Sequence, residues 1–223
     1  MNQFNSVVTR STTGVRETNK VLKNTYMLLS LTLLFSALMA GVSMAVNAPP
    51  MTNLVCFGLS IVLLWFVLPR TANSAAGIGV VFALTGLLGF GLGPILSMYL
   101  SLANGGQIIT TALGGTGVIF LGLSAFVLVT KKDFSFLGGF LVIGFLVVLM
   151  AALANIFLAM PAMSLAISAA VIFIMSGFIL YDTSRIINGG ETNYILATVG
   201  LYLSIYNIFV SLLQILGAFS GDD

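Results

Sequence analysis

The sequence predicts an all-α membrane protein in which seven helices cross the bilayer, and three observations support this. Of its 223 residues, 59% are hydrophobic and only 6% are charged. A soluble domain carries about 25% charged residues, so these few side chains cannot form a polar surface. Seven apolar runs are long enough to span a membrane, and the basic residues lie on one side of them.

Short polar segments separate the predicted spans. A transmembrane helix needs about 20 predominantly apolar residues. Runs of this kind cover residues 24–46, 53–69, 75–100, 107–130, 135–159, 162–187 and 193–218. Because a helix satisfies its own backbone hydrogen bonds in lipid, the sequence predicts one helical transmembrane domain over residues 24–223.

The basic residues predict the orientation of the chain. With seven spans, all eight fall on one side of the membrane: in the N-terminal segment, after the second and fourth spans, and near the end of the sixth. The segments on the other side contain no Lys or Arg. Since cytoplasmic loops are enriched in these residues, we predict a cytoplasmic N-terminus and a C-terminus on the opposite side.

Residues 1–23 differ in composition from the rest of the chain. They are rich in Ser, Thr and Asn and include Arg10, Arg16, Lys20 and Lys23. The apolar run that follows is longer than the core of a signal peptide, so we predict no cleaved leader. The low hydrophobicity predicts a flexible cytosolic tail over residues 1–23.

The composition also excludes several kinds of chemistry. The chain has no histidine, which removes the most common catalytic base and metal ligand. Its single cysteine, Cys56, cannot form an internal disulfide. The sequence has no nucleotide, haem or metal-binding motif. We therefore predict neither an enzyme nor a protein that binds a cofactor, a metal or nucleic acid at a dedicated site.

Glycines in the third and fourth predicted spans indicate close helix packing. Gly89 and Gly93 are four residues apart in the third span, and the fourth contains Gly114, Gly115, Gly117 and Gly122. Small residues allow helix backbones to approach one another in lipid. A hinge at residues 91–94, which end in Pro94, is the alternative interpretation of the third span.

The seventh span carries a polar stripe. Its members recur at steps of four, three, four and three residues, which places them on one face of a helix: Gly200, Ser204, Asn207, Ser211 and Gln214. Such a face avoids lipid, so we predict that this helix lies against or inside the other six. The stripe serves either interhelical hydrogen bonding or a polar pathway. Asn155, in the fifth span, is a further amide that needs a partner.

Asp182 is the unusual charge of the sequence, because it follows the apolar run of the sixth span. Gly189 and Gly190 predict the end of its helix. One interpretation is a surface pair with Arg185 at i, i+3. The other is that Asp182 faces the bundle interior as a functional carboxylate. In that case Arg70 and Arg185 are its candidate partners in a gating or latch contact.

At these residues the chain resembles a known family. The matching words are KKDFSFL at 131–137, NIF at 155–157, Tyr181-Asp182, and LYLSIYNIF at 201–209. Their order and spacing are similar to those of the transmembrane Bax inhibitor motif family, most closely its bacterial YccA-like branch. The resemblance covers essentially all of the chain after the N-terminal tail.

The resemblance implies a seven-helix bundle with the seventh helix at its centre. In calcium-leak members of the family, an acid of the sixth span shares a proton with an acid of the seventh, and pH gates the leak. Asp182 occupies the first position, whereas Ser204 occupies the second. A serine cannot raise the pKa of a neighbouring carboxyl by charge repulsion, so the sequence departs from the paired-acid sensor.

The YccA-like branch also resembles modulators of the membrane-bound, ATP-dependent protease FtsH. We therefore predict a multi-pass protein of the bacterial inner membrane, with its C-terminus in the periplasm, that modulates FtsH and membrane stress responses through protein–protein contact. The alternative is a pH-sensitive leak channel or transporter for calcium, protons or another cation.

Overall fold

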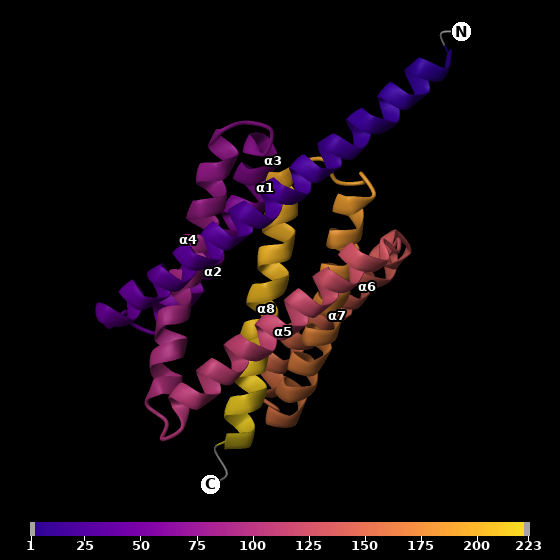
Figure 1. Cartoon of the computed structure of the whole chain (residues 1–223). Helices are drawn as coiled ribbons and strands as arrows, with labels where there is room; N and C mark the ends of the chain where they lie inside the picture. The colour runs from indigo at the N-terminus through magenta and orange to yellow at the C-terminus, as the bar shows by residue number, and fades with distance from the viewer. Residues whose placement is uncertain (1–2, 221–223) are drawn as a thin grey trace.

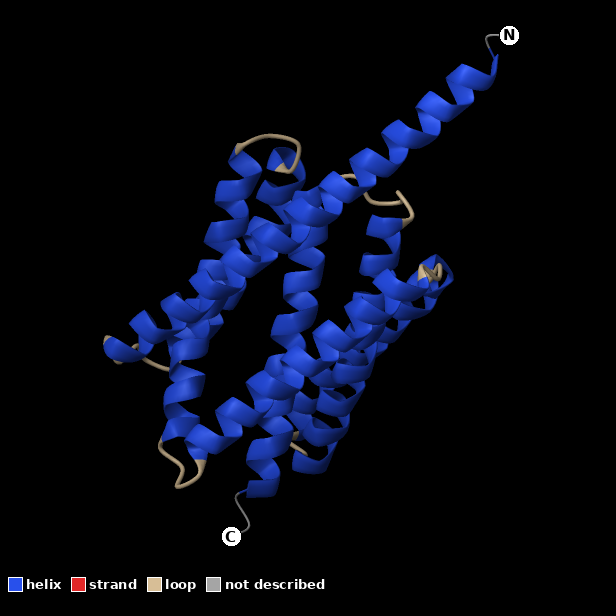
Figure 2. Cartoon of the chain, viewed as in Figure 1, coloured by secondary structure: helices blue, strands red, loops and turns tan. Residues whose placement is uncertain are grey.

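The computed structural model describes the backbone of residues 3–220 and the side chains of residues 18–220. All regular elements in this part of the chain are helical, and Figure 2 shows no strand there. In chain order they are α1 (Gln3–Ala45), α2 (Met51–Val62), η1 (Leu63–Val67), α3 (Leu68–Thr71), α4 (Ala76–Leu100), α5 (Gly105–Thr130), η2 (Ser135–Leu137), α6 (Gly138–Leu158), α7 (Pro161–Ile187) and α8 (Tyr194–Ser220).

These elements form seven apolar helical segments long enough to cross a membrane, as predicted. They cover Thr18–Ala45, Met51–Thr71, Ala76–Leu100, Gly105–Thr130, Ser135–Leu158, Pro161–Ile187 and Tyr194–Ser220. α1 is continuous from Gln3, so the boundary predicted at residue 23 does not coincide with the end of an element. The flexibility of the tail in solution stays a prediction.

Helix α8 lies at the centre of the bundle. It packs against α1, α4, α5 and α7, and in Figure 1 it runs between α1 and α4 on one side and α5 and α7 on the other. Of its most apolar 18 residues, 61% are buried, against 6% for α6, which lies at the outside. The structure thus confirms the predicted central position of the seventh span.

The second span contains a π-helical turn, η1, between α2 and α3. Pro69 explains this turn, because proline has no N–H with which to continue the α-helical ladder. The guanidinium of Arg70 donates a hydrogen bond to the carbonyl of Phe66 within this irregular turn. Arg70 is thereby placed at the exposed end of the second span.

The glycines of the third span allow α4 to pack closely on α1, as predicted. A Cβ at Gly89 would lie closer than 3.0 Å to the backbone of Ser36, and one at Gly93 closer than 3.0 Å to the side chain of Ser43. α4 is one helix through Pro94.

The same prediction is wrong for most of the fourth span. A Cβ at Gly114, Gly117 or Gly122 would meet nothing within 4 Å, because no helix in the described part of the chain covers these faces of α5. Gly115 differs, since its Cβ would lie 3.3 Å from the side chain of Leu212 on α8.

Candidate functional site

The polar candidates gather at the end of the bundle where α7 ends and α8 begins. Gly189 adopts a left-handed backbone conformation with φ of 75°. This conformation lets the N–H groups of Gly190 and Glu191 donate to the carbonyl of Arg185, at 2.8 and 3.1 Å. Glycine adopts left-handed conformations at little cost, so the predicted helix stop is confirmed.

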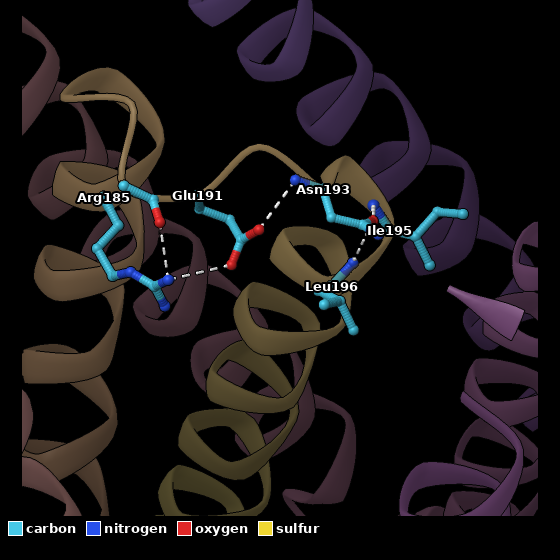
Figure 3. A network of polar contacts seen from close by, with 6 residues as sticks. Arg185, Glu191, Asn193, Ile195 and Leu196 are labelled. Atoms are coloured by element: carbon cyan, nitrogen blue, oxygen red, sulfur yellow. Dashed lines mark hydrogen bonds and ion pairs between the residues drawn. The ribbon is translucent and has the colours of Figure 1, made fainter. Parts of the chain in front are cut away.

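Arg185 closes this turn with its side chain. Its guanidinium donates to the carbonyl of Gly190 at 2.9 Å and lies 3.4 Å from the carboxylate of Glu191 (Figure 3). The guanidinium also lies over the ring of Tyr181, 5.5 Å from its centroid. Arg185 therefore binds the α7–α8 turn.

Asn193 is the N-cap of α8 and was not predicted from the sequence. Its Oδ1 accepts hydrogen bonds from the N–H groups of Ile195 and Leu196, at 2.9 and 3.2 Å (Figure 3). Its own N–H donates to Glu191 at 2.9 Å. An asparagine just before an apolar helical run is a common N-cap signal, and it was available in the sequence.

The same side chain joins two turns that are far apart in the sequence. The Nδ2 of Asn193 donates to the carbonyl of Ala72 and to the Oδ1 of Asn73, each at 2.9 Å. Ala72 and Asn73 lie in the α3–α4 turn. Asn193 thus fixes the start of the central helix against the end of the second span.

Asp182 faces α8 from α7. A Cβ added at Gly200 would lie 2.8 Å from the Oδ2 of Asp182. The absence of a side chain at Gly200 therefore leaves space for the Asp182 carboxylate next to α8. The side chain of Asp182 is half-buried. Among the side chains of residues 18–220, Asp182 forms no ion pair, and Arg70 and Arg185 bind the other partners described above. The predicted latch contact is not formed in this structure, and a gating role for these residues stays a prediction.

Ser204, which the resemblance predicts to occupy the second-acid position, is buried one turn further along α8. Its hydroxyl donates to the carbonyl of Gly200 at 3.1 Å. Asn207 likewise donates to its own helix, at the carbonyl of Leu203 and 2.8 Å. These two members of the polar stripe therefore satisfy part of their hydrogen bonding without a partner helix.

Other members of the predicted polar set do form contacts between segments. Gln214 accepts a hydrogen bond from Ser168 of α7 at 2.7 Å. Asn155 donates to Ser164 at 2.7 Å, and its Oδ1 accepts from the N–H of Met160 at 3.1 Å, which binds α6 to the start of α7. Ser211 is buried.

A second polar cluster lies where the α5–α6 turn meets α7. The hydroxyl of Ser184 accepts a hydrogen bond from the N–H of Phe134 at 2.8 Å and donates to Asp133 at 3.2 Å. Hydrogen bonds from the hydroxyl and the N–H of Ser135 lower the pKa of Asp133 below its usual value. Ser184 was not singled out from the sequence because a lone serine near a helix end carries no distinct signal.

Tyr202 is the largest fully buried side chain of the central helix. Its hydroxyl lies 2.7 Å from that of Ser36 on α1 and donates to the carbonyl of Thr85 on α4 at 3.3 Å. Sequence reasoning missed this residue because its spacing places it off the polar stripe. It joins three helices at the middle of the bundle.

The chemistry open to this arrangement is limited. Within the described residues, no three His, Cys, Asp or Glu side chains lie close enough to hold a metal ion together. The site instead contains the carboxylate of Asp182 in a transmembrane helix. Next to it, Arg185, Glu191 and Asn193 form the hydrogen-bond network that fixes the α7–α8 turn. Such a site suits a conformational element or a weak cation contact better than covalent chemistry.

Comparison with known proteins gives consistent matches over almost the whole chain. A family model described as "Inhibitor of apoptosis-promoting Bax1" matches residues 18–221. A protein of Escherichia coli strain K12, "Modulator of FtsH protease YccA", is 55% identical over 210 residues, which are 94% of this chain and 95% of that protein. An "Inner membrane protein YccA" of a second Escherichia coli strain matches to the same extent. An "Uncharacterized membrane protein" of Vibrio cholerae is 51% identical over 207 residues, 93% of each chain.

Proposed function

The chain belongs to the Bax inhibitor family, and on that premise we propose that it modulates the membrane-bound protease FtsH through protein–protein contact. The observation that carries this proposal is the 55% identity, over 94% of the chain, to a protein named as a modulator of FtsH. Modulation of this protease would connect the chain to membrane stress responses.

The proposed location is the bacterial inner membrane, with a cytoplasmic N-terminus and a periplasmic C-terminus. The contacts of Asn193 bring the α3–α4 and α7–α8 turns to one end of the bundle, and those of Ser184 bring the α5–α6 turn to α7 near the same end. Arg70, Lys131, Lys132 and Arg185 lie in or next to these turns and are therefore gathered at one end of the bundle, where Figure 1 shows the α3–α4 and α7–α8 turns. This clustering supports the orientation given by the positive-inside rule.

The N-terminal segment is the proposed contact with the protease. A processive protease grips a flexible segment outside the membrane, and the polar residues 1–23 precede the first predicted apolar span. Deletion of residues 2–17 removes most of this segment and none of the predicted spans. We expect the shortened protein to remain folded and to become more stable against turnover in cells that contain FtsH.

The control for this deletion is the same pair of proteins in cells depleted of FtsH, where both should decay at the same slow rate. Measurement of half-life after protein synthesis is stopped gives the comparison. Equal half-lives in cells with active FtsH would reject the segment as the protease contact. The modulator function itself has a separate test, in which the full-length protein is overproduced and the turnover of other FtsH substrates is measured. Unchanged turnover of those substrates would reject the modulator function.

A pH-sensitive cation leak is the second candidate function, and the position of Asp182 favours it. A carboxylate in a transmembrane helix that faces a neighbouring helix is a functional candidate by default. Its test is calcium flux through purified protein in liposomes at pH 6 and pH 8. We expect the wild type and Asp182→Asn to differ in flux, and Ser204→Asp, which restores the second acid, to make the flux steeper with pH. Flux equal to that of protein-free liposomes for all three proteins would reject a leak.

A further inference from the structure

A groove of about 450 Å³ lies between α1, α4, α5 and α8. Ala37 and Gly41 of α1 form part of one wall, Leu113 and Gly117 of α5 form part of the other, and Tyr206 and Phe209 of α8 lie between them. Its volume is within the range of about 300–1,000 Å³ that is usual for small-molecule sites. All of these residues belong to membrane-spanning segments.

The groove opens sideways, toward the lipid. α1 and α5 both pack on α8, yet within residues 3–220 their backbones do not pack against each other, although the rings of Tyr26 on α1 and Phe120 on α5 lie 6.0 Å apart. Tyr206 of α8 is half-buried between the two helices. Gly41 is exposed and Leu113 has 55% of its surface exposed, so the walls end at the outer surface of the bundle. In a membrane, whatever fills this opening comes from the bilayer or from another membrane protein.

The surface of the groove selects an apolar occupant. Three of its four hydroxyl groups are engaged within the protein: Tyr202 and Ser36 bond to each other at 2.7 Å, and Thr116 donates to the carbonyl of Ala112 at 2.7 Å. The remaining lining, apart from the Tyr206 hydroxyl, is mostly aliphatic and aromatic. Away from that hydroxyl, a polar group of a ligand would lose hydrogen bonds to water without gaining replacements.

The length of the groove matches one leaflet. Along α1 the lining runs from Leu33 to Met44, which is about 16 Å at 1.5 Å per residue. Half of a hydrocarbon core of about 30 Å is about 15 Å. A single acyl chain, which is long, apolar and flexible, fits a groove of this length and lining.

We propose that this groove binds one acyl chain of a membrane phospholipid, from the leaflet on the side of the α4–α5 turn. The acyl chain fills the opening between α1 and α5 and packs on Tyr206 and Phe209 at its base. The site is independent of the proposed protease contact, which concerns the opposite end of the bundle.

Photo-crosslinking tests this proposal with the full-length protein in phosphatidylglycerol liposomes that contain a lipid with a diazirine on one acyl chain. We expect the strongest labelling in peptides that carry the groove walls of α1 and α5. Gly117→Leu should reduce this labelling severalfold, because the side chain enters the groove. Gly114→Leu is the matched control, since its Cβ also meets nothing within 4 Å but Gly114 does not line the groove.

Circular dichroism and thermal unfolding verify that each variant is folded. If Gly117→Leu does not fold, Gly41→Leu fills the groove from the opposite wall, where a Cβ also meets nothing within 4 Å. Labelling of the groove no stronger than that of the exposed helix α6 would overturn the proposal. So would labelling that a folded groove-filling variant leaves unchanged, because the label would then come from lipid on the outer surface of α1 and α5 and not from lipid in the groove.

Discussion

Replacement of Asn193 by alanine should weaken the bundle more than its half-buried position at a turn suggests. The side chain caps α8 through Ile195 and Leu196 and also donates to Ala72 and Asn73. Alanine removes both sets of hydrogen bonds at once. The central helix then loses both its N-cap and its connection to the second span.

The expected loss can be worked out bond by bond. An N-cap contributes about 1 kcal/mol, and each of the two Nδ2 hydrogen bonds contributes up to about 1 kcal/mol. The bond to Asn73 is exposed, so its contribution is smaller. We expect Asn193→Ala to lower the free energy of unfolding by about 2 kcal/mol.

Two further variants separate the contributions. Asn193→Ser keeps a good N-cap but removes the Nδ2 donor, so it should lose about 1 kcal/mol. Asn104, the N-cap residue of α5, forms no side-chain cap hydrogen bond, so Asn104→Ala should change stability by less than about 0.5 kcal/mol.

Unfolding in mixed micelles with increasing mole fraction of a denaturing detergent, followed by helical circular dichroism, gives all three values. A loss for Asn193→Ala no larger than that for Asn104→Ala would refute the assignment of Asn193 as cap and bridge. Equal losses for Asn193→Ala and Asn193→Ser would mean that the N-cap hydrogen bonds make no measurable contribution to stability. The whole loss would then come from the Nδ2 hydrogen bonds to Ala72 and Asn73.

Three other predictions use the same unfolding assay. Gly89→Ala should destabilise the protein by about 1–3 kcal/mol, because its Cβ would overlap the backbone of Ser36, whereas Gly79→Ala, whose Cβ meets nothing within 4 Å, should be neutral or stabilising by up to about 1 kcal/mol. Tyr202→Phe should lower stability by about 1 kcal/mol, and the loss should be smaller in a Ser36→Ala background, since the two hydroxyls bond to each other. The lowered pKa of Asp133 contributes stability above its unfolded pKa of about 3.9 that is lost as pH falls through the lower folded value. Stability measured against pH should therefore fall less steeply on the acid side for Asp133→Asn than for the wild type.

The features that the sequence predicted correctly depend on local chemistry and on the membrane. Apolar length predicts the seven spans because the bilayer fixes the length of a crossing helix. Gly189 predicts the end of α7 because only the local backbone decides it. The polar stripe from Gly200 to Gln214 indicates a helix that avoids lipid, and α8 is the most buried span.

The features that it did not predict depend on the path of the chain between helices. Helical spacing pairs Arg185 with Asp182, but the left-handed turn at Gly189 brings Gly190 and Glu191 back to the guanidinium. The bridge from Asn193 to the α3–α4 turn joins residues about 120 positions apart, and no local pattern encodes it.

The packing of small residues shows the same limit. The sequence contains comparable glycines in α4 and α5, yet Gly89 and Gly93 of α4 meet α1 whereas Gly114 and Gly117 meet nothing within 4 Å. A glycine permits a close approach without specifying which helix approaches. The neighbour is determined by the arrangement of all seven spans, and in α5 that arrangement leaves an open face beside the groove.

Helix α8 is held by different forces along its length, and this bears on how the protein works. From Asn193 to Tyr202 it is fixed by directional hydrogen bonds: Asn193 to the α3–α4 turn, Thr198 to the carbonyl of Thr25, and Tyr202 to Ser36 and Thr85. Around Tyr206 and Phe209 it borders the apolar groove instead. Directional hydrogen bonds fix a helix in one register, whereas an apolar groove can be filled by acyl chains of different length and shape. A single charge or hydrogen bond should therefore have its largest effect at the end of α8 beside Asp182, and under the proposal of a bound acyl chain the groove would respond to the composition of the surrounding membrane.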